Sequence, residues 1–409
     1  MQFDYWTKRW RTNDILSTIA RVFTWPNREP QLCNMDLKPQ IAIDLLTTSD
    51  QVSGLARILL QERCIAIDTE SNSRHRYPER VCLIQVATNS KVYLIDALTV
   101  DDMKPLGEVM ADDRVVKVIH GADYDIRCLD REWGFQVRNL YDTSIATRFV
   151  GMNQIGLSSL AEVLLGVNVP KDAKLQKGDW SRRPLSQDAS NYAAADVWYL
   201  QRIQKALESK LRTLARSSWV AEECARLEQI RYVAPDPEMA YLSLKGSRRL
   251  TGQEKAILKR LFILREAEAR RLNRPPYYVL PHETLVHLAS NGDKDLSQIP
   301  SLKRQVDSRF GKLLRSALDK GLADPPISSS MRHSTQLATP EEKKRLRMLK
   351  KWRVDLGREL FIDQALIWPM VSLERLAKSP RKLSTEIQSP EVRQWQREQF
   401  ATSLGAYLA

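Results

Sequence analysis

The chain has 409 residues, 43% of them hydrophobic and 28% charged, which excludes a wholly disordered chain, a collagen and a disulfide-stapled miniprotein. No apolar run approaches the ~20 residues that cross a bilayer, and the five scattered cysteines form no C-x-x-C pair, so we expect no membrane span, no structural zinc and a reducing compartment. The net charge is +13; residues 211–409 alone carry +13, whereas residues 41–210 carry −2. This asymmetry suggests that one part of the chain holds a polyanion and the other part processes it, and the alternative is a surface that is charged only for solubility.

Residues 1–40 form an N-terminal extension with aromatic residues and arginines at roughly helical spacing. It lacks the apolar core of about 7–15 residues that defines a secretory signal, and Asp4 and Asp14 weigh against a mitochondrial presequence. We interpret it as an amphipathic segment that packs on the body, or as a misassigned start codon. A bacterial-type cytoplasmic location is therefore expected, with an organellar location as the alternative.

From about Ile41 helical and strand patterns alternate, which is typical of an α/β domain. Two strands separated by a short polar turn predict an antiparallel hairpin. The predicted strands are Cys64–Ile67, Val81–Ala87, Val92–Ile95 and Val115–Ile119, and the predicted helices are Val52–Gln61, one that begins near Asp123, Leu157–Leu165 and one from about Ser186 to Leu211. We expect a mixed sheet flanked by helices.

After about Val233 almost all patterns are helical, with linkers at residues 234–237 and 324–330. Two stretches of this region repeat each other at an offset of 88 residues. The matching residues are Leu261, Arg265, Leu272, Pro281, Leu285, Leu288 and Ala289 in the first copy, and Leu349, Arg353, Leu360, Pro369, Leu373, Leu376 and Ala377 in the second. Each copy predicts a helix, a loop and a proline that opens a second helix, so we expect two copies of one small helical domain.

The first chemical signal is a pair of acids, Asp68 and Glu70, at the end of a buried apolar strand. In an extended chain residues i and i+2 project from the same face, so these like charges would be neighbours. Such a pair is unfavourable unless cations neutralise it, and carboxylate oxygens suit Mg²⁺ or Mn²⁺. The alternative is a strand that simply ends in a polar turn.

The second signal is the run His120–Ile126, which follows another strand. Asp123 is a natural N-cap for the next helix, and that structural role is sufficient to explain it. Asp125 falls in the first turn and could reach the same cleft, because open α/β sheets bind ligands at strand ends. We interpret His120 as a buried, hydrogen-bonded residue in preference to a substrate contact.

The third signal is Tyr192 and Asp196, whose i, i+4 spacing places both side chains on one helical face. The three alanines between them allow a close approach to the sheet. An acid on an otherwise apolar stretch needs a partner or a metal, although a surface-facing Asp196 is the alternative. Two cations held by these four acids could activate water and stabilise the leaving oxygen of a phosphodiester. Tyr192 would hydrogen-bond the attacking water, either to orient it or to take its proton.

In this order the motifs resemble those of the ribonuclease D family. The residues that carry the resemblance are Asp68-Thr69-Glu70, Asp125 within HGADYDIRCL, the run DWSRRPLS at residues 179–186, and Tyr192 with Asp196 within YAAADVWYL. The tyrosine is similar to that of the DEDD subclass named for it. The helical repeat resembles the helicase-and-RNase-D C-terminal (HRDC) domain.

The resemblance implies a metal-dependent 3′→5′ exoribonuclease that releases nucleoside 5′-monophosphates by a two-metal-ion mechanism. Asp68, Glu70, Asp125 and Asp196 would be ligands of two divalent ions, Mg²⁺ or Mn²⁺, and Tyr192 would position the water. The implied fold is a ribonuclease H-like mixed-sheet exonuclease domain followed by two HRDC-like domains, at residues 41–233, 245–323 and 337–409. The implied partner is RNA with a free 3′ end, above all tRNA precursors and other small structured RNAs, with no membrane and no obligate protein partner.

The basic helical part would supply phosphate contacts. The candidates are the cluster Lys245, Arg248 and Arg249 and the run Lys343, Lys344, Arg345, Arg347, Lys350 and Lys351, and either group could be only a solvated helix face. Tyr124 and Trp180 could stack a terminal base, but such aromatics are more often core residues. The alternative functions are a 3′→5′ exonuclease that acts on DNA and a catalytically silent RNA-binding scaffold. The sequence has no P-loop, which disfavours a helicase.

Overall fold

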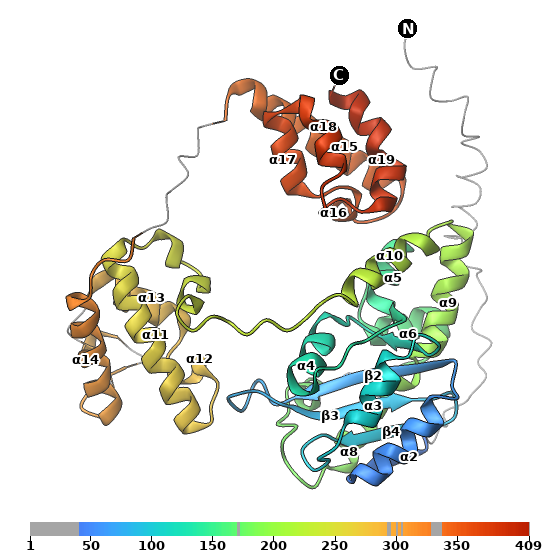
Figure 1. Ribbon diagram of the computed structural model, residues 1–409, viewed down its shortest axis with the longest axis horizontal. Coiled ribbons are helices and arrows are strands. Elements are labelled where there is room, and N and C mark those ends of the chain that lie inside the picture. The colour runs from blue at the N-terminus through green and yellow to red at the C-terminus, as the bar shows by residue number, and fades with distance from the viewer. Residues whose placement is uncertain are drawn as a thin grey trace.

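A computed structural model describes residues 41–169, 172–292, 296–299, 302–303, 306–328 and 338–408. The expectations for residues 1–40 therefore lie outside the described residues. The chain forms one α/β part and two helical groups (Figure 1). Within the described residues, no helix combines the length and the apolar character that a membrane crossing requires.

The α/β part is built on a six-stranded sheet with the order β1-β4-β3-β2-β5-β6. The strands are β1 Ile43–Leu46, β2 Cys64–Ser71, β3 Val81–Ala87, β4 Val92–Asp96, β5 Val116–Ile119 and β6 Leu140–Asp142. The pairs β2/β3 and β3/β4 are antiparallel, and β1/β4, β2/β5 and β5/β6 are parallel. The expected hairpin and the mixed sheet are confirmed. The central strand β3 is buried along its whole length because helices cover both faces.

Apolar residues on both faces of the sheet dictate this layering. On one face, Ile65, Ile67 and Ile84 pack with the apolar side of α2 (Ser49–Leu59) and with α3 (Lys104–Ala111). On the other face, Ala66 and Leu83 pack with α8 (Gln187–Trp198). The remaining helices of this part are α4 Asp123–Trp133, α5 Thr143–Phe149, α6 Leu157–Leu165, α7 Ala173–Gln176, α9 Leu200–Thr213 and α10 Ser217–Leu227.

A single helix was expected from about Ser186 to Leu211, but the structure has two helices, because the helical conformation is interrupted at Tyr199. Tyr199 ends α8 and precedes α9, and its own side chain is buried. No glycine or proline marks the break; the two helices follow different surfaces, α8 the sheet face and α9 the strands β2 and β5 and the helices α5 and α6. Tertiary packing therefore overrides a continuous helical pattern.

The two helical groups repeat the same order of elements at the 88-residue offset. The helices α11 (Gly252–Leu272), α12 (Pro276–Val279) and α13 (His282–Asn291) correspond in starting position to α15 (Pro340–Glu359), α16 (Gln364–Ile367) and α17 (Met370–Lys378). Thr251 and Thr339 both open their helices with capping boxes. The groups end with α14 (Arg309–Ala323), and with α18 (Leu383–Ile387) and α19 (Gln394–Leu408). Three matched pairs of leucines, among them Leu285 and Leu373, are fully buried, whereas Leu272 is 43% exposed.

The second helical group shares its core with the α/β part. Trp395 of α19 stacks on Trp219 of α10 with ring centroids 4.7 Å apart and meets Phe149 of α5 edge-on at 5.2 Å. Glu222 of α10 accepts hydrogen bonds from the first backbone N–H groups of α19, at 2.7 and 3.0 Å. Because those N–H groups have no partner within their own helix, α10 caps α19 across the domain boundary.

Candidate metal centre

Three carboxylates from two elements meet at the end of strand β2. Asp68 and Glu70 project from one face of β2, and Asp196 projects from α8, which crosses that face. One carboxylate oxygen of each lies within 4.8 Å of the others. Hard oxygen donors in this arrangement fit a divalent cation such as Mg²⁺ or Mn²⁺.

Asp125 lies against this group from the first turn of α4. It is buried and accepts a hydrogen bond from the Thr69 hydroxyl, which comes from the opposite face of β2. Its charge contributes to raising the pKa of both Asp68 and Glu70, so it belongs to the same electrostatic site. We call Asp68, Glu70, Asp125 and Asp196 the carboxylate cluster.

Burial and mutual repulsion oppose ionisation of the carboxylate cluster. Burial raises the pKa of Asp68 well above its ordinary value, and the charges of Asp125, Asp196 and Glu70 raise it further. The pKa of Glu70 rises to about 9, through burial and then through Asp196 and Asp125, and burial alone raises that of Asp196 to about 7. Bound cations remove this cost, so the donor set fits divalent metal ions.

Tyr192 joins the cluster from one turn before Asp196. Burial raises its pKa, as do the charges of Asp196 and Glu70, so its hydroxyl belongs to the same electrostatic site. The ring of Trp180 lies 6.2 Å away between centroids and restricts the Tyr192 ring. Ala193 and Ala194 are fully buried, which allows α8 to lie close to the sheet.

Asp123 has no place in this site. It is the first residue of α4 and not the expected N-cap, which is Ala122. Its exposed carboxylate pairs with Arg127 at 3.0 Å. The N-cap expectation was wrong because Asp142, from the end of β6, already accepts the N–H groups of Gly121 and Ala122, at 3.1 and 2.8 Å. His120 is hydrogen-bonded to Thr143 at 2.9 Å, as interpreted, but it is only partly buried; desolvation lowers its pKa.

Sequence reasoning missed Gln85 and the ion pair of Arg183 with Asp96. Gln85 is fully buried directly opposite Asp68 in the β2/β3 ladder, and its side-chain amide forms no hydrogen bond with any described residue. A polar residue within the apolar run VCLIQVA is the signal that could have revealed it. Arg183 binds Asp96 and donates to the carbonyls of Trp180 and Cys82, at 2.7 and 2.9 Å, which fixes the loop that carries Trp180.

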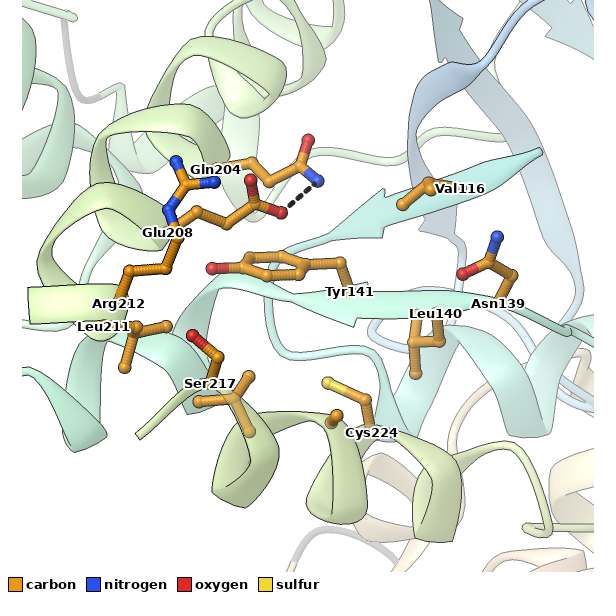
Figure 2. A pocket seen from close by; sticks show the side chains of 12 residues that line it. Val116, Asn139, Leu140, Tyr141, Gln204, Glu208, Leu211, Arg212, Ser217 and Cys224 are labelled. Atoms are coloured by element: carbon orange, nitrogen blue, oxygen red, sulfur yellow. Dashed lines mark hydrogen bonds between the residues drawn. The ribbon is translucent and has the colours of Figure 1, made fainter. Parts of the chain in front are cut away.

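A pocket of about 440 Å³ lies elsewhere, between β6, α9 and α10 (Figure 2). Its lining includes Val116, which pairs with Cys64 at the start of β2, whereas the carboxylate cluster lies at the other end of that strand. Figure 2 shows the Tyr141 ring beside Glu208 and Arg212. None of the cluster residues lines this pocket, so we assign it no part in the site.

Known proteins resemble this chain in both sequence and fold. The 3′-5′ exonuclease family matches residues 43–212, and the HRDC domain family matches residues 254–318. A ribonuclease D from Granulibacter bethesdensis is 30% identical over 367 residues, which cover 87% of this chain and 90% of the relative. One from Pseudomonas paraeruginosa is also 30% identical, over 83% of this chain and 90% of the relative.

Two solved structures share the fold. Escherichia coli RNase D, described as an exoribonuclease involved in structured RNA processing, superposes with a TM-score of 0.70 at 24% identity and covers 90% of this chain and 99% of its own. The catalytic core of RRP6 from Trypanosoma brucei has a TM-score of 0.59 at 25% identity, over 69% of this chain and 80% of its own. The ribonuclease H-like mixed sheet with a helical C-terminal part, including one HRDC domain, is therefore confirmed.

Proposed function

The chain belongs to the ribonuclease D family and is a 3′→5′ exoribonuclease, and on this premise we propose that Asp68, Glu70, Asp125 and Asp196 hold two divalent cations while Tyr192 positions the attacking water. The observation that carries the proposal is the convergence of Asp68, Glu70 and Asp196, from a strand and a helix far apart in sequence, within 4.8 Å. Mg²⁺ and Mn²⁺ both suit these donors.

The residues around the cluster hold its geometry. Cations at this site, when bound, activate water and stabilise the leaving oxygen of a phosphodiester. The Thr69 hydroxyl holds one oxygen of Asp125, which leaves the other free to face the site. The Tyr192 hydroxyl, one turn from Asp196 and restricted by Trp180, orients the water by a hydrogen bond. The products would be nucleoside 5′-monophosphates.

We propose tRNA precursors and other small structured RNAs with free 3′ ends as substrates. The excess of basic residues beyond residue 211 supports this, because phosphate contacts position RNA without reading its sequence. Lys245, Arg248, Arg249, Lys343 and Lys344 are all exposed and available for such contacts. Arg345 differs from its neighbours, since its guanidinium donates to the carbonyl of Ala377. The named relatives are bacterial proteins, and we propose the bacterial cytoplasm as the place of action.

The division into an extension (1–40), an exonuclease domain (41–233) and two HRDC-like domains (245–323 and 337–409) is also a proposal. The second helical group lies outside the HRDC family match. Its three helices at the 88-residue offset and its matching capping box support a second, diverged copy.

The test of the site is hydrolysis of an end-labelled tRNA precursor with Mn²⁺ by the full chain and its Asp68→Asn variant. We expect Asp68→Asn to abolish hydrolysis and Asp123→Asn, at an exposed acid that pairs with Arg127, to leave it unchanged. Full activity of Asp68→Asn would refute the site. A circular RNA should resist attack, and faster hydrolysis of matched single-stranded DNA than of RNA would favour the alternative substrate.

A further inference from the structure

The loop between β2 and β3 is held by the first helical group. This loop, residues 72–80, leaves β2 directly after Glu70 and Ser71. The Tyr77 hydroxyl donates to Glu266 of α11, and its backbone N–H donates to Asn273 at 3.2 Å. The helical group therefore contacts the segment that directly follows the strand of Asp68 and Glu70.

Two tyrosines stand exposed where this helical group meets the loop. Tyr277 and Tyr278, on α12, are 42% and 64% exposed, and their ring centroids lie 4.6 Å apart with the planes tilted by 38°. The Tyr277 hydroxyl donates to the carbonyl of Arg74 in the loop, at 3.2 Å. Much of each ring stays in water although the pair is held at a domain junction, and exposed aromatic faces of this kind suit contact with a ligand.

Positive charges accompany the two rings. Arg74 and Arg274 are exposed, and neither forms an ion pair with any residue that the structure describes. The charge of Arg74 acts on Tyr277 directly, since it opposes the rise that burial causes in the pKa of that tyrosine. Nearby Arg271 is different, because Glu268 neutralises it at 2.6 Å. Aromatic faces with unneutralised guanidinium groups match the chemistry of unpaired nucleotides.

We propose that Tyr277 and Tyr278 form a stacking platform for unpaired bases of the RNA strand that leads to the carboxylate cluster, with Arg74 and Arg274 on its phosphates. This inference rests on the proposed function and specifies where the single-stranded part of the substrate lies. Stacking accepts any base, which suits an enzyme that removes successive nucleotides. A duplex presents its bases only at its ends, so the platform selects a single-stranded tail.

The test compares binding of two RNAs by the full chain in chelator, which prevents hydrolysis. One is a hairpin with a single-stranded 3′ tail, and the other is the same hairpin with a blunt end. We expect Tyr278→Ala to weaken binding of the tailed RNA by about 5- to 100-fold, with little change for the blunt hairpin. Tyr278→Phe should restore binding because the ring suffices. Tyr407→Ala, at a 42% exposed tyrosine on the other helical group, is the control.

The outcomes separate this inference from the proposed function. Asp68→Asn should bind the tailed RNA as the unchanged protein does and yet fail to hydrolyse it, whereas Tyr278→Ala with Mn²⁺ should show a raised KM and an unchanged kcat. Unchanged affinity of Tyr278→Ala for the tailed RNA, or an equal loss for both RNAs, would overturn the platform and leave the metal site standing. Thermal unfolding of each variant reports that the fold is intact.

Discussion

At the scale of single residues, the carboxylate cluster gathers one buried acid, Asp125, and three partly buried acids at the end of one strand. Burial comes first among the causes that raise the pKa values of all four, and mutual repulsion adds to it for Asp68 and Glu70. The folded chain therefore binds more protons here than the unfolded chain does at neutral pH. Without cations, the cluster therefore lowers the stability of the folded chain.

The metal-free protein should accordingly lose stability as the pH rises. The ordinary carboxyl pKa is about 4, and the pKa of Glu70 in the fold is about 9, so the free energy of unfolding should fall across this window. Asp68→Asn removes one repelling charge and should raise the unfolding temperature at pH 8 by about 2–4 °C. Thermal unfolding in chelator between pH 5 and 9 measures this, with Asp123→Asn as the control. A less stable Asp68→Asn at pH 8 would contradict it.

The side chains of this site differ in how far the sequence could predict them. Asp68, Glu70, Tyr192 and Asp196 follow from local spacing, because i, i+2 on a strand and i, i+4 on a helix share a face. Gln85 does not, since only the strand register places it opposite Asp68. The N-cap prediction for Asp123 failed for the same kind of reason. The acid that bonds the start of α4 is Asp142, 20 residues from Ala122 in sequence.

At the scale of elements, α8 determines where half of the site lies. Ala193 and Ala194 face the sheet, so the helix that carries Tyr192 and Asp196 approaches β2 and β3 closely. The sequence predicted this close approach. It did not predict the end of α8 at Tyr199 or the helix α10. It also missed the short elements β1, α3, β6 and α5, because segments of three to eight residues have too few positions to show a period.

Enlarging a residue beneath α8 should therefore impair catalysis more than stability. We expect Ala194→Leu to move α8 away from the sheet, at a cost of about 1–3 kcal/mol in stability. The displacement of Tyr192 and Asp196 should lower kcat about 100-fold, because catalysis is sensitive to ~1 Å. Asn191→Leu, on the exposed face of the same helix, adds comparable bulk without this effect. Steady-state hydrolysis with Mn²⁺ and thermal unfolding measure both quantities, and a near-normal kcat in Ala194→Leu would contradict the argument.

At the scale of the whole molecule, charge and architecture separate two tasks. The exonuclease part is nearly neutral and holds the acids, whereas the helical groups carry the positive charge. Each group contacts the exonuclease part, the first through Tyr77 and the second through Trp395. The helical repeat could be predicted from the sequence, whereas these contacts could not, since they join distant segments.

The exposed lysines of α15 allow this division to be measured. Each phosphate contact to single-stranded RNA contributes about 0.7 to the slope of log affinity against log salt concentration. The double variant Lys343→Gln and Lys344→Gln should therefore bind a tRNA precursor more weakly at low salt, with a slope shallower by up to about 1.4. The matched control changes Lys104 and Lys205, two exposed lysines of the exonuclease part, to glutamine. The affinity of each variant for the tRNA precursor is measured in chelator over a range of salt concentrations. An equal slope for the α15 variant and the unchanged protein would show that these lysines only solvate the helix. A larger effect of the control pair would place the RNA on the exonuclease part instead.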